Sequence, residues 1–119
     1  VGKKNYVLSH NDLNSSNVMF KNNKIVFIDF EYLSINSKYS DLSKLIDSLN
    51  LKTIEKDKLL KGYGINEIND SINIKIKKWS LMNIYTELIW ANYINEYKRN
   101  YFDKDYINLL KKKIKQQRL

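Results

Sequence analysis

The chain has 119 residues, a formal net charge of +8 and a hydrophobic fraction of 43%. That much apolar material supports one packed domain and argues against an intrinsically disordered chain. Cysteine is absent, which excludes disulfides and thiolate metal sites, and no apolar run approaches the roughly 20 residues of a membrane-spanning helix.

The first third of the chain predicts strands and a hairpin. Short apolar runs at residues 6–8, 17–20 and 25–28 are typical of strands. Asn22 and Asn23 separate the second and third runs, and asparagine tolerates the positive φ angles of a tight hairpin turn. The predicted order is strand, polar loop and β-hairpin.

Helical spacing begins at residue 40 and continues to the end of the chain. Ser40 is the expected N-cap of a first helix, whose apolar residues recur at i, i+3, i+4 and i+7: Leu42, Leu45, Ile46 and Leu49. Thr53 is expected to cap a second helix that stops at residue 62, with a loop at 62–64. Further helices are expected over about 69–100 and 105–117, so the fold class is α+β, mainly α.

Two apolar stripes run along the long third helix. One consists of Leu81, Ile84, Leu88 and Ala91, and the other consists of Trp90, Tyr93 and Tyr97. An apolar surface this wide predicts burial on more than one side of the helix.

A polar loop follows the first predicted strand and reads His10-Asn11-Asp12-Leu13-Asn14-Ser15-Ser16-Asn17. It fits the pattern H-x-D-L-x-x-x-N, which in protein kinases is the catalytic loop. In that loop the aspartate accepts the proton of the substrate hydroxyl and the asparagine holds a magnesium ion. Asp12 is therefore the candidate base and Asn17 a candidate metal ligand.

A second acidic motif, Ile28-Asp29-Phe30-Glu31, follows the predicted hairpin. Asp29 comes twelve residues after Asn17, at the place where kinases carry a second magnesium-binding aspartate. Glu31 replaces the glycine of that kinase motif, and it is either a carboxylate near the site or an ion-pair partner. The competing interpretation is that these polar residues only cap turns, as Asp and Asn often do at strand ends.

The variant "SHNDLNSSN…FIDFEYLSINSKYSDLSKLI" resembles the choline/ethanolamine kinase family, within the aminoglycoside-phosphotransferase-like kinases. The resemblance is firm over residues 8–46 and loose beyond them. It implies the C-terminal lobe of a protein-kinase-like fold, with Asp12 as the base and with Asn17 and Asp29 binding Mg²⁺ on ATP. It also implies that His10, Asn11 and Asp41 support the loop.

The same resemblance implies an amino-alcohol site. Ile89-Trp90-Ala91-Asn92-Tyr93 is similar to the F-W-x-x-W segment whose rings surround choline in that family. Glu31, Trp90, Tyr93 and Tyr101 are the expected substrate-binding residues. An ordinary aromatic core remains an alternative for these rings. Because residues 49–53 offer no ring where the family has one, ethanolamine or another small amino alcohol remains open as the acceptor.

We expect a single domain over 1–119, with the catalytic loop and metal-binding hairpin in 1–35 and a helical region in 40–119. Neither a Gly-rich loop nor a strand lysine precedes the catalytic loop, so the expected partner is a missing N-terminal lobe. The chain alone is then expected to be inactive. We expect a cytoplasmic enzyme that makes precursors of phospholipid headgroups.

Two alternatives concern the ligand. The first is a kinase for an aminoglycoside, thiamine or a sugar. The second is a non-catalytic basic domain that binds nucleic acid or an anionic membrane, based on the +8 charge and on the lysines at 111–113 and 115 with Arg118. Such lysines more often form a solvated helix face than a binding patch, and no nucleic-acid-binding motif accompanies them.

Overall fold

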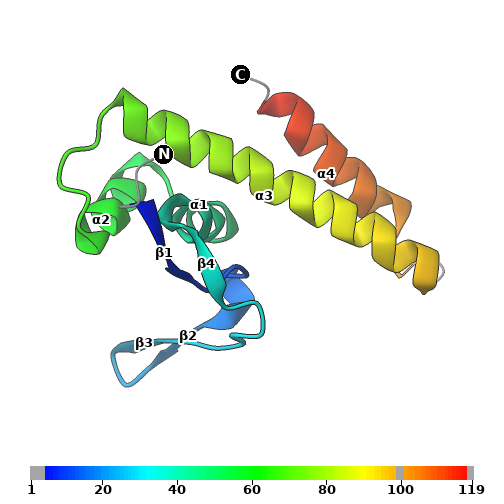
Figure 1. The fold of residues 1–119 in the computed structure, drawn as a ribbon, viewed down its shortest axis with the longest axis horizontal. Coiled ribbons are helices and arrows are strands. Elements are labelled where there is room, and N and C mark those ends of the chain that lie inside the picture. The colour runs from blue at the N-terminus through cyan, green and yellow to red at the C-terminus, as the bar shows by residue number, and fades with distance from the viewer. Residues whose placement is uncertain (1–4, 99–100, 118–119) are drawn as a thin grey trace. The chain divides into compact units, whose positions relative to one another are not determined.

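The computed structural model describes residues 5–98 and 101–117. They form two small antiparallel sheets and four α-helices, so the predicted α+β, mainly helical fold class is confirmed (Figure 1). The chain divides into two compact units, Val1–Trp79 and Ser80–Leu119, called the N-terminal and C-terminal units below. A single domain over 1–119 stays a prediction.

The N-terminal unit contains all four strands. β1 (Tyr6–Ser9) pairs antiparallel with β4 (Ser34–Ser37), and β2 (Val18–Lys21) pairs antiparallel with β3 (Lys24–Phe27). The three predicted strands and the hairpin turn are confirmed, with φ angles of 51° at Asn22 and 60° at Asn23. β4 was missed, because Ser-Ile-Asn-Ser has one large apolar residue and no strand signal of its own.

The boundaries of the first two helices differ from the predictions. α1 (Lys38–Ser48) begins earlier than expected, because the Ser37 hydroxyl caps it by accepting a hydrogen bond from the Tyr39 N–H at 3.3 Å. Ser40 as the N-cap is therefore wrong, and Ser40 is buried inside the helix.

In α2 (Thr53–Tyr63), Thr53 is the first helical residue and not the cap. Lys52 precedes it, and its N–H donates to the Glu55 carboxylate at 2.8 Å. The loop predicted at 62–64 is also wrong, because the helix continues to Tyr63. It ends where Gly64 adopts the left-handed conformation, with φ of 106°, that such a terminus favours.

Helices α1 and α2 and the first turns of α3 (Asp70–Tyr97) enclose the core of the N-terminal unit. Its buried side chains are Tyr39, Leu42, Ile46, Leu60, Ile65 and Ile76. The Lys56 ammonium on α2 also donates to the Asn73 amide oxygen on α3 at 2.9 Å. This core supports α1, and α1 carries Asp41, whose carboxylate binds the backbone of the polar loop.

The C-terminal unit is formed by the rest of α3 and by α4 (Lys104–Gln116). Its buried apolar residues are Ile84, Ala91, Ile107, Leu110 and Ile114, with Leu81 and Leu88 packed against them. The first predicted stripe of α3 is therefore buried. The second is not, since Trp90, Tyr93 and Tyr97 are 47%, 53% and 71% exposed, so the prediction of burial on more than one side is wrong.

The described lysines at 111–113 and 115 are exposed on α4, while Arg118 lies outside the described residues. A solvated face and a binding patch would both be exposed, so the choice between them stays a prediction. Ile107, Leu110 and Ile114 of α4 are buried at helical spacing, whereas Leu109 is exposed. Within 5–98 and 101–117, none of the helices is both long and apolar enough to cross a membrane.

Candidate active site

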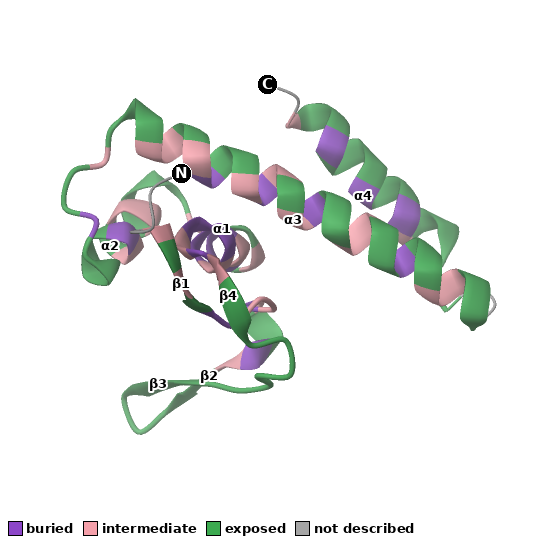
Figure 2. Ribbon diagram, viewed as in Figure 1, coloured by how far each residue is buried: buried purple, intermediate pink, exposed green. Residues whose placement is uncertain are grey.

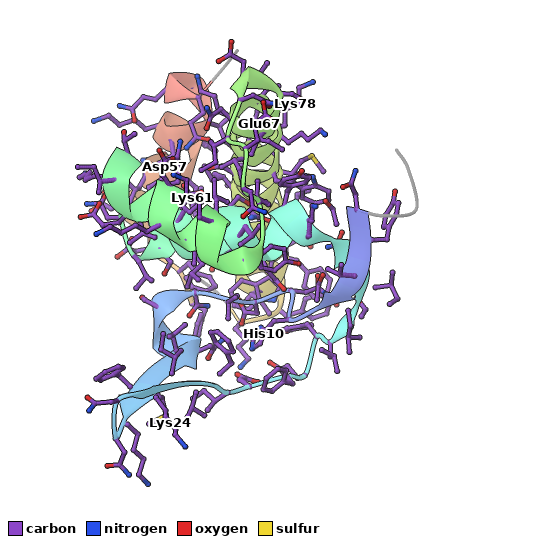
Figure 3. All side chains as sticks on the ribbon, turned by 90° about the vertical axis from the view of Figure 1, so that its left-hand side faces the viewer. His10, Lys24, Asp57, Lys61, Glu67 and Lys78 are labelled. Atoms are coloured by element: carbon purple, nitrogen blue, oxygen red, sulfur yellow. The ribbon has the colours of Figure 1, made fainter. Side chains whose placement is uncertain are left out.

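The His10 ring joins the polar loop to Ile28, the residue that precedes Asp29 (His10 is labelled in Figure 3). The imidazole is buried, and its Nε2–H donates to the Ile28 carbonyl at 2.7 Å. Nδ1 then accepts the Asp12 N–H at 3.1 Å, which fixes the neutral tautomer. The Phe30 ring lies 4.8 Å from the imidazole. One side chain thus holds the backbone on both sides of the candidate site.

The Asp41 carboxylate, in the first turn of α1, binds the backbone at the start of the polar loop. Its Oδ2 accepts the His10 N–H at 2.7 Å, and its Oδ1 accepts the Asn11 N–H at 2.9 Å. Asn11 itself has a φ of 68°, in the left-handed region that asparagine tolerates better than most residues. Hydrogen bonds to a charged acceptor are stronger than neutral ones. The start of the loop is therefore tied to the helix supported by the core.

The Asn11 side chain ties the loop to the segment after Asp29. Its Nδ2 donates to the Tyr32 carbonyl at 2.7 Å and to the Ser34 hydroxyl at 2.7 Å. Its Oδ1 accepts from the Asn36 amide at 2.9 Å. The structure thus brings His10, Asn11 and Asp41 together as a network of loop-holding contacts.

Both carboxylate oxygens of Asp12 receive amide hydrogen bonds. Asn14 Nδ2 donates to Oδ1 at 3.1 Å, and Asn17 Nδ2 donates to Oδ2 at 3.2 Å and to the Asp12 carbonyl at 2.8 Å. Asn17 is buried in the 3₁₀ turn Ser15–Asn17, whereas Asp12 is only half-buried. Because the Asn17 amide nitrogen faces Asp12, the amide oxygen is the atom left for a metal ion.

Asp29 is held next to this pair through the backbone of Ile28. The Ile28 N–H donates to the Asn17 carbonyl at 3.0 Å, while the Ile28 carbonyl accepts from His10. Asp29 itself is exposed and has a φ of 62°, an uncommon conformation for a non-glycine residue. Non-glycine residues with such positive φ angles occur preferentially at functional sites. The exposed Glu31 lies two residues further along.

The oxygen atoms of Asn17 and Asp29 suit Mg²⁺, which prefers hard oxygen ligands. No group of three His, Cys, Asp or Glu side chains that could hold a metal lies among residues 5–98 and 101–117. That result is compatible with magnesium, because proteins usually bind it through one or two carboxylates together with substrate phosphates and water.

The first 48 residues match the family model of choline/ethanolamine kinase. The resemblance drawn from the sequence motifs is confirmed over this segment, and it indicates a kinase-type phosphotransferase. The matched segment includes Asp12, Asn17, Asp29, Glu31 and Asp41. A search of curated proteins found no match to the chain.

The rings that the choline kinase resemblance selected lie in the C-terminal unit and fall into two groups. Trp90 packs edge-on against Phe102 at 5.2 Å between ring centroids, and Tyr101 packs on the same ring at 5.0 Å. Tyr93 instead pairs with Tyr97 at 4.7 Å. The structure thus brings Trp90 and Tyr101 to one shared ring and associates Tyr93 with a different one.

Three contributors to these sites were missed at the sequence level. Asn14 holds one carboxylate oxygen of Asp12, and a second amide three residues before Asn17 could have suggested it. Phe102 joins Trp90 to Tyr101, and its position next to Tyr101 was the available signal. The backbone contribution of Ile28 had no signal in the sequence, because any residue type except proline supplies the same N–H and C=O.

Proposed function

We propose that the chain carries the catalytic base and the magnesium ligands of an ATP- and Mg²⁺-dependent phosphotransferase. Its acceptor is the hydroxyl of choline or a related amino alcohol, and its product is a precursor of a phospholipid headgroup. The observation that supports this most is the hydrogen-bonded pair of Asp12 and Asn17, linked through Ile28 to Asp29. The match to the choline/ethanolamine kinase family covers these residues.

Asp12 accepts the proton of the acceptor hydroxyl in this mechanism. Asn14 and Asn17 hold its two carboxylate oxygens, so the carboxylate cannot rotate freely about χ2. Each carboxylate oxygen has two lone pairs and receives one amide hydrogen bond, so a substrate hydroxyl can still reach the half-buried group. Phosphoryl transfer depends mainly on such positioning and on charge stabilisation.

The Asn17 amide oxygen and the Asp29 carboxylate are the metal-binding atoms of the proposal. Mg²⁺, when bound, neutralises charge on the β- and γ-phosphate oxygens of ATP. The contribution of the chain is to fix the direction of both ligands. Asn17 is oriented by its bonds to Asp12, and Asp29 by the attachment of Ile28 to Asn17 and His10.

The acceptor is assigned through the exposed rings of the C-terminal unit. A quaternary ammonium group has no N–H to donate, so aromatic rings are the main groups that can bind it, at about 0.5–2 kcal/mol for each cation–π contact. Trp90 is about half exposed and lies against Phe102, so part of its surface remains accessible to a ligand. Tyr93, Tyr101 and Glu31 are further candidates, and all three are exposed.

A second lobe is part of the proposal, and the hairpin supports it. The strands β2 and β3 form a two-stranded sheet that is almost entirely exposed, including Phe20 at 73% and Ile25 at 63% (Figure 2). Two-stranded hairpins are marginal on their own, and exposed apolar patches of this kind mark interaction surfaces. We propose that an N-terminal lobe with the phosphate-gripping loop and lysine covers this surface, and that the chain alone is inactive.

The test compares the chain alone with the product of its full reading frame. ADP release is measured with Mg²⁺, ATP and a panel of choline, ethanolamine, thiamine, a sugar and an aminoglycoside. The expected result is choline- or ethanolamine-dependent turnover by the full-length product and none by the chain alone. Loss of turnover when Mg²⁺ is chelated is also expected.

Asp12→Asn in the full-length product separates catalysis from folding. It keeps the size of the side chain but removes the base, so kcat is expected to fall by roughly 10²–10⁴-fold with little change in KM for the acceptor. Asp70→Asn, at an exposed carboxylate in the first turn of α3, is the matched control and should retain full activity. Full turnover by Asp12→Asn would refute the proposed role.

A further inference from the structure

Phe102 is the centre of the aromatic cluster in the C-terminal unit. The rings of Trp90, Tyr101 and Tyr106 all lie around it, at centroid distances of 5.2, 5.0 and 5.0 Å. Tyr106 is stacked on Phe102, whereas Trp90 and Tyr101 meet it edge-on. The relative placement of Trp90 and Tyr101 therefore depends on where Phe102 is held.

The Asn95 side chain holds Phe102 by its backbone. Asn95 Oδ1 accepts the Phe102 N–H at 2.8 Å, and Asn95 Nδ2 donates to the Phe102 carbonyl at 3.0 Å. One amide group thus satisfies both backbone polar groups of a residue seven positions later. Phe102 immediately precedes Asp103, the N-cap of α4, so the same pair of bonds also sets where α4 begins.

Two charged groups lie next to these rings. The Lys98 ammonium is 5.4 Å from the Tyr101 ring centroid, so a ring of the cluster already attracts a cation of the chain itself. The Glu87 carboxylate, one helical turn before Trp90, accepts a hydrogen bond from the Tyr106 hydroxyl. The Tyr101 ring thus presents a face that attracts an ammonium group, and an organic cation would compete with Lys98 for that face.

We infer that Asn95 is the positioning residue of the amine-binding surface, because it places Phe102 against Trp90 and so forms the ring pair that receives the cation. This inference rests on the proposed function, which assigns the acceptor to these rings. Asn95 touches no ligand in this scheme and acts only through Phe102. Without the two backbone bonds, Trp90 keeps its place on α3 but loses the ring that completes the surface.

The experiment uses the full chain with Trp79→Phe, which leaves Trp90 as the only tryptophan. Trp90 fluorescence is titrated with choline, with tetramethylammonium, and with dimethylbutanol, in which carbon replaces the ammonium nitrogen of choline. Asn95→Ala removes both hydrogen bonds to Phe102. Asn95→Asp keeps the oxygen that accepts the Phe102 N–H but loses the donor to the Phe102 carbonyl. Asn92→Ala is the matched control, since the Asn92 amide donates to the Leu88 carbonyl of its own helix at 3.0 Å.

The parent and Asn92→Ala are expected to bind both cations in preference to dimethylbutanol. Asn95→Ala is expected to bind them roughly 3- to 30-fold more weakly, the range of one cation–π contact, with Trp90 emission shifted to the red. Asn95→Asp should lie between the two. Unchanged far-UV circular dichroism across the series would show that α3 and α4 remain folded.

Two results would overturn the inference: equal cation binding by Asn95→Ala and the parent, or no response of Trp90 to either cation in the parent. Failure of the proposed function looks different. If the full-length product transfers no phosphate to any amino alcohol while cation binding still depends on Asn95, the kinase assignment fails and the positioning role stands.

Discussion

Replacing Asp41 with alanine should destabilise the N-terminal unit more than replacing any comparable surface carboxylate. The carboxylate accepts the N–H groups of His10 and Asn11 at 2.7 and 2.9 Å. A hydrogen bond to a charged group contributes about 1.5–3 kcal/mol, which gives about 3–6 kcal/mol for the pair. Because Asp41 is only half-buried and water can reach the freed N–H groups, we expect a loss near the lower end, about 3 kcal/mol.

The assay is urea unfolding followed by Trp79 fluorescence in a Trp90→Phe background, because Trp79 packs against the core of the N-terminal unit. With a denaturant slope of about 1 kcal/mol per molar urea, Asp41→Ala should lower the midpoint by roughly 3 M or abolish the transition. Asp70→Ala is the control, since Asp70 is also acidic and lies in the first turn of a helix. It loses only the helix-dipole contribution of about 0.3–1 kcal/mol. Equal midpoint shifts for the two variants would refute the reasoning.

Two further predictions concern a tyrosine and the hairpin turn. Burial, followed by the hydrogen bond to Glu87, raises the pKa of Tyr106 above its ordinary value of 10.0, so the folded state keeps a proton that the unfolded chain loses. Its contribution to the stability of the C-terminal unit is therefore complete below about pH 10 and declines as the pH rises further. Tyr106→Phe should lower the free energy of unfolding by about 1 kcal/mol at neutral pH and make its alkaline decline less steep. The measurement is urea unfolding at several pH values, followed by Trp90 fluorescence. An alkaline slope identical to that of the parent would contradict the prediction. At Asn23, where φ is 60°, glycine should slow amide exchange in β2 and β3, whereas valine should speed it by costing roughly 1–2 kcal/mol; indistinguishable exchange rates would exclude the turn as the determinant of the hairpin.

The sequence predicted those parts of the fold that depend on local patterns. The hairpin was predictable because two asparagines between apolar runs specify a turn that needs positive φ at both positions. The buried stripe of α3 was predictable because Ile84 and Ala91 recur at helical spacing. The exposure of Trp90 and Tyr93 was not, since periodicity identifies an apolar face without showing what covers it.

The candidate site was predictable as a set of residues but not as a set of contacts. The spacing of Asp12, Asn17 and Asp29 is a sequence motif, whereas the strand β4 depends on pairing with β1, a long-range contact without a local signature. The N-cap of α1 illustrates the same limit. Ser37 and Ser40 are equivalent by residue type, and only the path of the chain leaving β4 decides which hydroxyl meets a free N–H.

The backbone of Ile28 is a single peptide segment bonded on one side to Asn17 and on the other to His10. The loop that carries Asp12 and the segment that carries Asp29 therefore move together, because these two hydrogen bonds connect them. A comparison of side chains among relatives would not reveal this coupling, because the residue type at position 28 can vary while its N–H and C=O groups keep the same two hydrogen bonds. Only a change that alters the main chain itself, such as proline, would disconnect the two halves of the site.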